Sequence, residues 1–389
     1  MITLLITDQN LAPVGDPIDG WTSLDCTKRF NEPGSGSVTL PASPDVMAAL
    51  QPGHRIVVMR DGQVWMAGPM EIPQEIEVGY SSGEGGGQAP PGEITISFTD
   101  DLGRIAGYIT WPDPTEAWED QPTATWRTIT NETGETIIRT LVDENCGPNS
   151  LEERQIPNLV LGAVAGVGTT TLVNTRFEGL LEACRRVAID GGGLGFRTVQ
   201  VDRDIVFEVY EPRDLSATAR FSFGLGNLRH LRAKISAPTV THALVAGTED
   251  EDTSSRTFVE VADPSAASTW YRVEKFVDGS AADDSEGELT QAGREELAGG
   301  ASPVELATVT VDTPDLVAGR DFDLGDRVSV QLPNGTEVTD VVRSIHLQAS
   351  PASGEYVTTL VGSAEATSDP QMVRVVQELT RRLGRITAR

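Results

Sequence analysis

The chain has 389 residues, more than one hydrophobic core usually serves, so about two to four domains are expected. Its 58 acidic and 30 basic residues give a formal net charge of −28. This excludes a protein that holds nucleic acid mainly through the phosphate backbone, because that affinity comes from clustered cations. The low aromatic content of 5%, with 39 glycines and 23 prolines, favours short strands and turns over long helices.

The N-terminal 105 residues predict one strand after another. "MITLLITD" opens the segment, and "SVTLPA", "EIEVGY" and "EITISFTD" follow. Ile94, Ile96 and Phe98 alternate with polar residues, which is the period of a strand with one buried face. The tract "SSGEGGGQAPPG" is too polar and glycine-rich to pack. We therefore expect an antiparallel sheet or small barrel over residues 1–107 with one long surface loop.

Two stretches far apart in the chain repeat one pattern. "LQPGHRIVVMRDGQVWMAG" covers residues 50–68, and "DLGDRVSVQLPNGTEVTDVVR" covers residues 323–343. In both, a glycine and an arginine two positions later precede a β-branched run, and then Asp61-Gly62 or Asn334-Gly335 supplies the residues of a tight turn. Each stretch predicts a β-hairpin.

Residues 108–215 predict an α+β domain entered through an irregular stretch that contains Trp111, Trp118 and Trp126. "TGETIIRTLVDENCG" predicts a helix with Thr133 as N-cap and Gly147-Pro148 as its end. "NTRFEGLLEACRRVAIDGGG" predicts a second helix, with Asn174 or Thr175 as N-cap and Gly191 as its end. Its apolar face is Phe177, Leu180, Leu181, Cys184 and Val187.

A hairpin should follow these helices in "FRTVQVDRDIVFEVYEPRD". We place its turn at Arg203-Asp204. Val199 and Val201 then face the second strand, whose alternating apolar residues are Ile205, Phe207 and Val209.

The rest of the chain alternates strands with an acidic stretch. Strand patterns at residues 241–247, 304–313 and 355–362 predict a second β domain over 216–248 and 305–365. Residues 249–304 form an acidic insertion that ends in a predicted helix, "TQAGREELAGG". Residues 366–389 predict a C-terminal helix with apolar residues at heptad spacing, at Met372, Val376, Leu379, Leu383 and Ile386. That helix suits packing on its own domain and self-association equally well.

No group of residues predicts catalysis, a cofactor or a metal. The glycines of residues 162–174 precede a predicted helix, but lack the Gly-Lys-Ser/Thr ending of a phosphate loop, so a plain loop is favoured. The four histidines stand apart: His54, His230, His242 and His346. Carboxylate pairs such as Asp283-Asp284 and those of residues 249–252 lie in polar stretches of a very acidic chain, which favours a solvated surface.

The three cysteines, Cys26, Cys146 and Cys184, are too few and too widely spaced for a disulfide framework or a zinc site, so we expect buried thiols. The N-terminus "MITLLITDQN" has no basic flank, and no stretch approaches 18 uninterrupted apolar residues. We expect neither a signal peptide nor a membrane span.

Three segments, in this order, resemble the tail-hub (baseplate hub) and minor tail proteins of long-tailed bacteriophages, especially those of actinobacterial siphophages. They are "FNEPGSGSVTLPAS" with "LQPGHRIVVMRDGQVWMAGPM", then "FEVYEPRDLSATARFSFGLGNLRHL", then "FDLGDRVSVQLPNG" with "VVRSIHL" and "VTTLVG". The resemblance covers most of the chain. It implies a mainly β fold with α+β insertions, in which two similar antiparallel β-barrel tube domains carry peripheral domains and three copies form a ring.

The same resemblance implies a structural, non-enzymatic role at the tail tip of a virion. The homotrimer would adapt a hexameric tail tube to a three-fold tip and gate the channel. Its implied partners are distal tail or tail tube proteins above, tip or fibre proteins below, and the tape-measure protein in the lumen, with no specific nucleic-acid binding. The alternative is a tail-tip enzyme or carbohydrate-binding protein that acts on the host envelope, with the Trp111, Trp118 and Trp126 cluster as a sugar platform.

Overall fold

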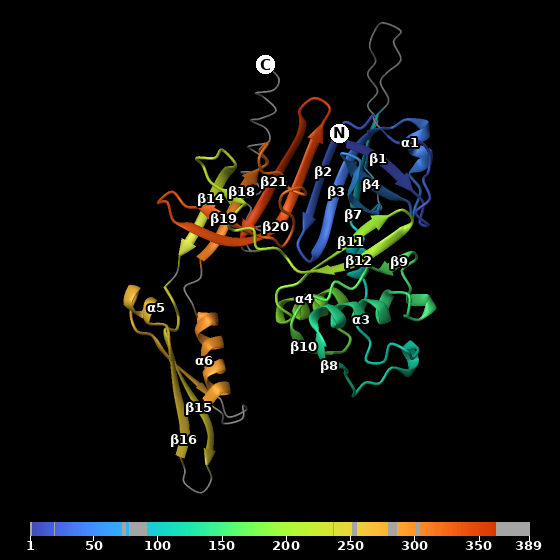
Figure 1. Cartoon of the computed structure of the whole chain (residues 1–389). Coiled ribbons are helices and arrows are strands. Elements are labelled where there is room, and N and C mark those ends of the chain that lie inside the picture. The colour runs from blue at the N-terminus through green and yellow to red at the C-terminus, as the bar shows by residue number, and fades with distance from the viewer. Residues whose placement is uncertain are drawn as a thin grey trace. The chain divides into compact units, whose positions relative to one another are not determined.

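The computed structural model describes residues 2–18, 20–71, 75–77, 92–235, 237–250, 255–278, 286–300 and 304–362. Strands dominate these ranges, which confirms the mainly β prediction (Figure 1). The chain divides into two compact units: the first comprises Met1–His230 and Thr308–Arg389, and the second comprises Leu231–Ala307. The predicted C-terminal helix of residues 366–389 lies outside the described residues.

The first unit holds two strand-rich halves separated in the chain by an α+β part. The first half contains β1 (Ile2–Thr7), β2 (Ser23–Arg29), β3 (Glu32–Pro41), α1 (Pro44–Ala49), β4 (Arg55–Arg60), β5 (Gln63–Pro69), β6 (Glu75–Glu77), β7 (Glu93–Thr99) and α2 (Leu102–Ile105). The second half contains β13 (Arg220–Phe221), β14 (Leu228–Ile235), β18 (Val304–Val311), β19 (Arg327–Gln331), β20 (Glu337–Ser350) and β21 (Gly354–Gly362). Strands β14 and β18 carry the chain to and from the second unit.

The two halves share one strand order. In the first half, β1-β4-β5 continues through a Met70–Phe98 bridge to β7, then β3 and β2. In the second half, the order is β13-β19-β20-β21-β18-β14. Leaving aside β6, which pairs beside β7, the six strands of each half therefore follow the same path when numbered along the chain. One difference is that β1 is antiparallel to β4, whereas β13 is parallel to β19.

A single pairing joins strands of both halves into one sheet. The antiparallel pair β2·β20 runs from Leu24 opposite Ala349 to Arg29 opposite Ser344. Figure 1 shows β2 and β3 continuing the sheet of β20 and β21. Within the described residues this ten-stranded sheet stays open, and none of the smaller sheets closes into a barrel.

Both repeated stretches fold as the predicted hairpins. Strands β4 and β5 pair up to Arg60 and Gln63 around Asp61 and Gly62, whose φ angles of 52° and 80° are those of a two-residue hairpin turn. The other hairpin pairs β19 with β20, and its Gly335 has a φ of 86°. The glycines that precede the first strands, Gly53 and Gly325, have φ angles of 84° and 86°. The repeat thus extends from residue types to backbone conformation.

The α+β part contains η1 (Trp118–Asp120), β8 (Arg127–Thr133), α3 (Gly134–Cys146), η2 (Glu152–Arg154), β9 (Leu159–Leu161), β10 (Thr170–Thr175), α4 (Leu180–Asp190), β11 (Gly195–Val201) and β12 (Asp204–Tyr210). Helix α3 is confirmed to its caps: the Thr133 side chain accepts a hydrogen bond from the Thr136 N–H, and Gly147 follows the last turn. Its apolar face and that of α4 belong to one core with Phe196, Phe207 and Val209. The three cysteines are buried, as predicted.

Two details of this part differ from the prediction. Helix α4 starts at Leu180 with Gly179 as N-cap, because Asn174 and Thr175 belong to β10, which pairs with β8. Phe177, which we expected on the helix face, is 43% exposed and has a φ of 53°.

The turn of the β11–β12 hairpin also lies one residue earlier, at Asp202-Arg203, because Val201 pairs with Asp204. Moving the turn by one residue changes the partner of each residue by two, which keeps the side chains on the same faces. In this register Thr198 and Gln200 pair with Phe207 and Ile205, whereas Val199 and Val201 pair with Val206 and Asp204.

The second unit is a small sheet with one covered face. It contains β15 (His242–Asp250), β16 (Ser255–Ala262), α5 (Pro264–Thr269), β17 (Glu274–Asp278) and α6 (Glu286–Gly300), in the sheet order β16-β15-β17. The helix predicted at residues 290–300 is confirmed within α6, which packs on Ala243 and Val245 through Leu289. Apolar side chains at other positions of these strands are exposed to solvent: Leu244, Phe258 and Phe276 are 42%, 55% and 55% exposed.

Among all described residues, no helix is both long and apolar enough to cross a membrane.

Candidate functional site

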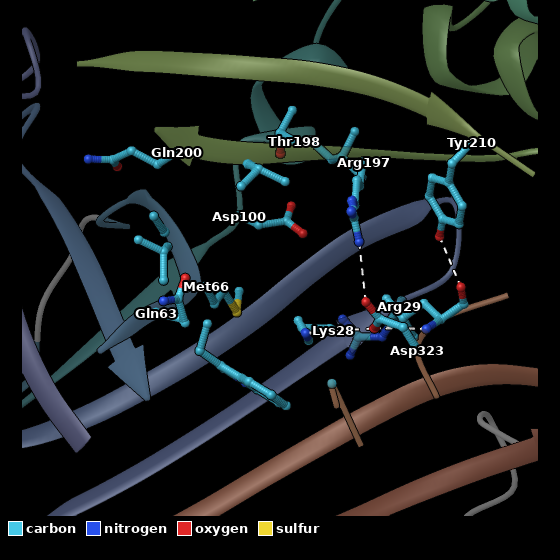
Figure 2. Close-up of a pocket in the computed structure, with 17 residues that line it drawn as sticks. Lys28, Arg29, Gln63, Met66, Asp100, Arg197, Thr198, Gln200, Tyr210 and Asp323 are labelled. Atoms are coloured by element: carbon cyan, nitrogen blue, oxygen red, sulfur yellow. Dashed lines mark hydrogen bonds and ion pairs between the residues drawn. The ribbon is translucent and has the colours of Figure 1, made fainter. Parts of the chain in front are cut away.

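A cavity of the first unit lies where both strand-rich halves meet the α+β part (Figure 2). Its volume is about 400 Å³. We call it the junction cavity. The polar and aromatic side chains that line it come from β2, β5, β11 and β12 and from the loops after β7 and before β19. They are Lys28, Arg29, Gln63, Trp65, Asp100, Arg197, Thr198, Gln200, Tyr210 and Asp323.

One asparagine fixes the end of β2 against the α+β part. Asn31 occupies the tight turn between β2 and β3 with a φ of 55°, a conformation that asparagine tolerates better than most residues. Its side-chain NH₂ donates to the Leu194 carbonyl at 2.9 Å, and its side-chain oxygen accepts from the Phe196 N–H at 2.8 Å. The Arg185 side chain donates to the Asn31 carbonyl at 2.8 Å. Lys28 and Arg29, which precede this turn, are thereby held at the start of β11.

Asp323 connects the second half to the other two parts. Its carboxylate lies 3.2 Å from the Arg197 guanidinium on β11 and 4.0 Å from the Lys28 ammonium on β2. Arg197 also pairs with Glu208 at 3.1 Å, and the Tyr210 hydroxyl donates to the Leu324 carbonyl at 3.0 Å. Figure 2 shows Arg197 and Tyr210 reaching from their strands toward Asp323 and its neighbour.

An aromatic ring covers the Lys28 ammonium on another side. Its nitrogen lies 3.8 Å from the centre of the Trp65 ring, and the Arg60 guanidinium lies 5.0 Å from the same ring. Burial lowers the pKa of Lys28, and the charge of Asp323 partly opposes this shift. The cation–π contact stabilises the charged form where few water molecules can reach it.

Asp100 is the second carboxylate of the cavity wall. One of its oxygens accepts a hydrogen bond from the Gly34 N–H at 2.8 Å, and the other is buried without a partner among the described residues. Burial raises the pKa of Asp100 to about 6, despite its backbone hydrogen bonds. Burial raises the pKa of Asp312, a neighbour of Arg60, to about 6 as well.

The raised pKa of Asp100 predicts a pH-dependent stability. Between about pH 4 and about pH 6 the folded protein keeps a proton that the unfolded chain releases, so stability is highest below this interval and falls as pH rises through it. Asparagine at position 100 keeps an acceptor for Gly34 and has no charge to bury. We expect Asp100→Asn to raise the free energy of unfolding at neutral pH by about 2 kcal/mol and to flatten this fall.

Urea unfolding at a series of pH values measures this effect. Asp312→Asn should remove a comparable part of the fall, and the double variant should remove both parts. A profile for Asp100→Asn that runs parallel to that of the original protein would contradict the assignment.

A buried ion pair lies beside the cavity. Arg55, 1% exposed, donates to both oxygens of Asp101 at 2.5 and 2.7 Å, and one of its nitrogens also donates to Gln200 at 3.2 Å. Arg55 opens β4, two positions after Gly53, the first repeated glycine. At the other repeat, Asp326 follows Gly325 and pairs with Arg213 at 2.5 Å, but the Arg213 side chain is 54% exposed. Both hairpins are thus held by an Arg–Asp pair at their entrance.

Residues 3–363 match a protein family that is described as Siphovirus ReqiPepy6 Gp37-like protein. The chain belongs to this family. A search of curated proteins found no match. The resemblance to siphovirus tail proteins is confirmed at the level of the family, and solved structures support the fold.

Three solved structures with related folds are tail proteins, two of them from prophages. The 43 kDa tail protein of prophage MuSo2 from Shewanella oneidensis is 12% identical, with 92% of this chain and 97% of that chain covered and a TM-score of 0.53. The tail protein from Neisseria meningitidis MC58 is 15% identical, with 93% and 97% covered and a TM-score of 0.52. Prophage tail protein gp18 from Listeria monocytogenes EGD-e is 12% identical, with 97% and 99% covered and a TM-score of 0.52. At these identities the likeness concerns the fold.

Within the glycine-rich stretch of residues 162–174, residues 162–169 form a loop between β9 and β10, as favoured by the sequence, and residues 170–174 belong to β10. The backbone of this loop does bind a carboxylate, but that carboxylate is the side chain of Glu135 in the same chain. The Ala165 and Val167 N–H groups donate to the two carboxylate oxygens of Glu135, at 2.7 and 2.9 Å. Glu135 lies in the first turn of α3, where a carboxylate also compensates the helix dipole.

The other sequence candidates stay apart. Among the residues described, no three His, Cys, Asp or Glu side chains gather as metal ligands would. Trp111 lies against the Arg154 guanidinium at 3.8 Å and Trp126 against that of Arg176 at 4.5 Å, so arginine covers one face of each proposed sugar platform. Trp118 is 71% exposed. Asp283 and Asp284 lie outside the described residues, as do parts of residues 249–252.

Proposed function

We propose that this protein is a structural, non-enzymatic tail-hub protein that acts as a homotrimer at the tail tip of a siphovirus. Its family and the tail proteins that share its fold support a place in the phage tail. The observation that carries the hub role is the shared strand order of the two halves, together with the matching glycine conformations of Gly53 and Gly325. On this proposal, each chain supplies two similar tube domains.

Two similar domains per chain explain how a three-fold assembly can meet a six-fold tube. Three copies would present six equivalent hairpins, with the β4–β5 and β19–β20 hairpins of one chain about 60° apart around the ring axis. The open ten-stranded sheet supports the same idea, because an open sheet leaves edge strands that neighbouring copies in a ring would cover.

The partners of such a ring follow from its position. Distal tail or tail tube proteins would bind above it, tip or fibre proteins below it, and the tape-measure protein would occupy its lumen. The net charge of −28 suits a channel that lets DNA pass without holding it. The ring would gate this channel before infection.

The peripheral parts would serve assembly. We propose the division predicted from the sequence, with tube domains over 1–107 and over 216–248 with 305–365, an α+β domain over 108–215, an acidic insertion over 249–304 and a terminal helix over 366–389. The second tube domain of this division overlaps the second unit at β15, which pairs with β16 and β17. The exposed apolar face of the second unit, formed by Leu244, Phe258 and Phe276, is an expected contact surface, because such patches mark interaction sites.

Native mass spectrometry of the purified chain tests the trimer directly. We expect a trimer or larger ring at high concentration, and images of the virion tip should place the two hairpins at equivalent positions around a six-fold ring. A strict monomer that never enters virions would refute the hub role. Clearing of host cell-wall preparations by the purified protein would instead support the enzymatic alternative.

A further inference from the structure

The wall of the junction cavity carries more positive than negative charge. Three cationic side chains, Lys28, Arg29 and Arg197, face two carboxylates, Asp100 and Asp323. This surplus lies in a chain with 28 more negative than positive charges. A cationic cavity in so acidic a protein concentrates attraction for anions at one place, where low-dielectric walls reduce screening by the solvent.

Lys28 has hydrogen-bonding capacity that the described residues do not use. Its ammonium has three N–H donors, and its one polar contact among these residues, with Asp323 at 4.0 Å, exceeds hydrogen-bond distance. The side chain is 20% exposed, so its head group borders the cavity instead of bulk solvent. The indole N–H of Trp65, beneath the ammonium, also lacks an acceptor among the described residues. The cavity wall is therefore rich in donors.

The residue type itself supports a specific role. The chain uses lysine at only three positions, residues 28, 234 and 275, whereas its other basic residues are arginines. Arginine makes planar, forked contacts, while lysine presents a compact charge with donors that rotate toward a rounded anion. Arg197, by contrast, is committed to Glu208 and Asp323.

We propose that the junction cavity binds a small oxyanion, of the phosphate or carboxylate class, through the Lys28 ammonium. Such an ion supplies acceptors to unused donors and offsets the surplus charge. The volume of the junction cavity, about 400 Å³, is near the lower end of the range for small-molecule pockets. Because Lys28 and Asp323 belong to different halves, a bound oxyanion would brace the junction. This role is independent of the proposed position in the tail.

Isothermal titration of the full-length protein with inorganic phosphate, and separately with acetate, tests the proposal at matched ionic strength. We expect saturable binding of at least one of these ions, weakened by about tenfold to a hundredfold in Lys28→Met. The matched control is Lys275→Met, since Lys275 lies in the second unit, 53% exposed and paired with Glu296. This control should bind as the original protein does.

A variant with the opposite expected effect keeps the proposal testable even if Lys28→Met loses binding through misfolding. Asp323→Asn removes the carboxylate that competes for Lys28 and Arg197, so the affinity for the oxyanion should rise by severalfold. A lysine with a merely structural role would give no such gain. The proposal is overturned if neither ion binds saturably, if Lys28→Met binds as well as the original protein, or if both lysine variants lose binding equally.

Discussion

Replacing Arg55 with methionine is expected to lower the free energy of unfolding by about 3 to 5 kcal/mol, one of the two largest effects we predict. The Asp101 carboxylate accepts its hydrogen bonds in the described structure from Arg55, and both side chains are nearly inaccessible, at 2% and 3% exposure. Removing the guanidinium leaves the Asp101 charge buried and unpaired between the first half and β11. The cost comes mainly from that unpaired charge, not from lost attraction.

Two further variants separate these contributions in urea unfolding. Arg55→Met combined with Asp101→Leu removes both charges and should recover most of the loss. Arg213→Met, at the other repeated hairpin, should cost only about 1 kcal/mol, because Arg213 is half exposed and Asp326 keeps hydrogen bonds from the Arg213 and Asp323 N–H groups. Equal losses from Arg55→Met and Arg213→Met would contradict the role of burial.

Sequence patterns predicted the elements whose determinants are local. Helix α3 carries its own N-cap, Thr133, and its own stop at Gly147, so its bounds could be derived from a short window. The hairpins at Asp61-Gly62 and Asn334-Gly335 carry their turn residues with them. In these cases no distant contact changes the result.

The predicted start of α4 was wrong because contacts with residues distant in the sequence determine where the helix begins. The Thr175 hydroxyl hydrogen-bonds that of Thr110 at 2.6 Å, and the Phe177 N–H donates to the Thr110 carbonyl at 2.8 Å. These contacts keep the predicted first turn of the helix in a non-helical conformation until Leu180. No pattern within residues 174–180 records them.

The junction cavity was beyond sequence patterns for the same reason. Lys28, Asp100, Arg197 and Asp323 come from four separate stretches, and each alone is an ordinary charged residue at a strand end or in a loop. One signal was available: lysine is rare in this chain, and Lys28 is one of only three. Rarity marks a residue but does not reveal its partners.

The second large effect is expected from Gly68→Ala, which should destabilise the folded protein by about 3 kcal/mol or more. Gly68 lies in β5, where the chain passes β7 so closely that a Cβ atom would approach the Thr99 carbonyl oxygen to 1.8 Å and the Asp100 Cα to 2.8 Å. Both obstacles are backbone atoms, which cannot rotate away. The extra methyl would therefore push β5 from β7 at the point where the Met70–Phe98 bridge continues the strand order of the first half.

Gly62→Ala is the matched control for this prediction. Gly62 has a positive φ of 80°, which alanine adopts reluctantly, but a Cβ atom there would meet nothing within 4 Å. We expect this control to lose only about 1 kcal/mol in urea unfolding followed by circular dichroism. The comparison separates backbone strain in an open turn from steric exclusion at a strand crossing. If the turn variant loses more stability than the strand variant, the close passage of β5 over β7 does not limit the fold of the first half.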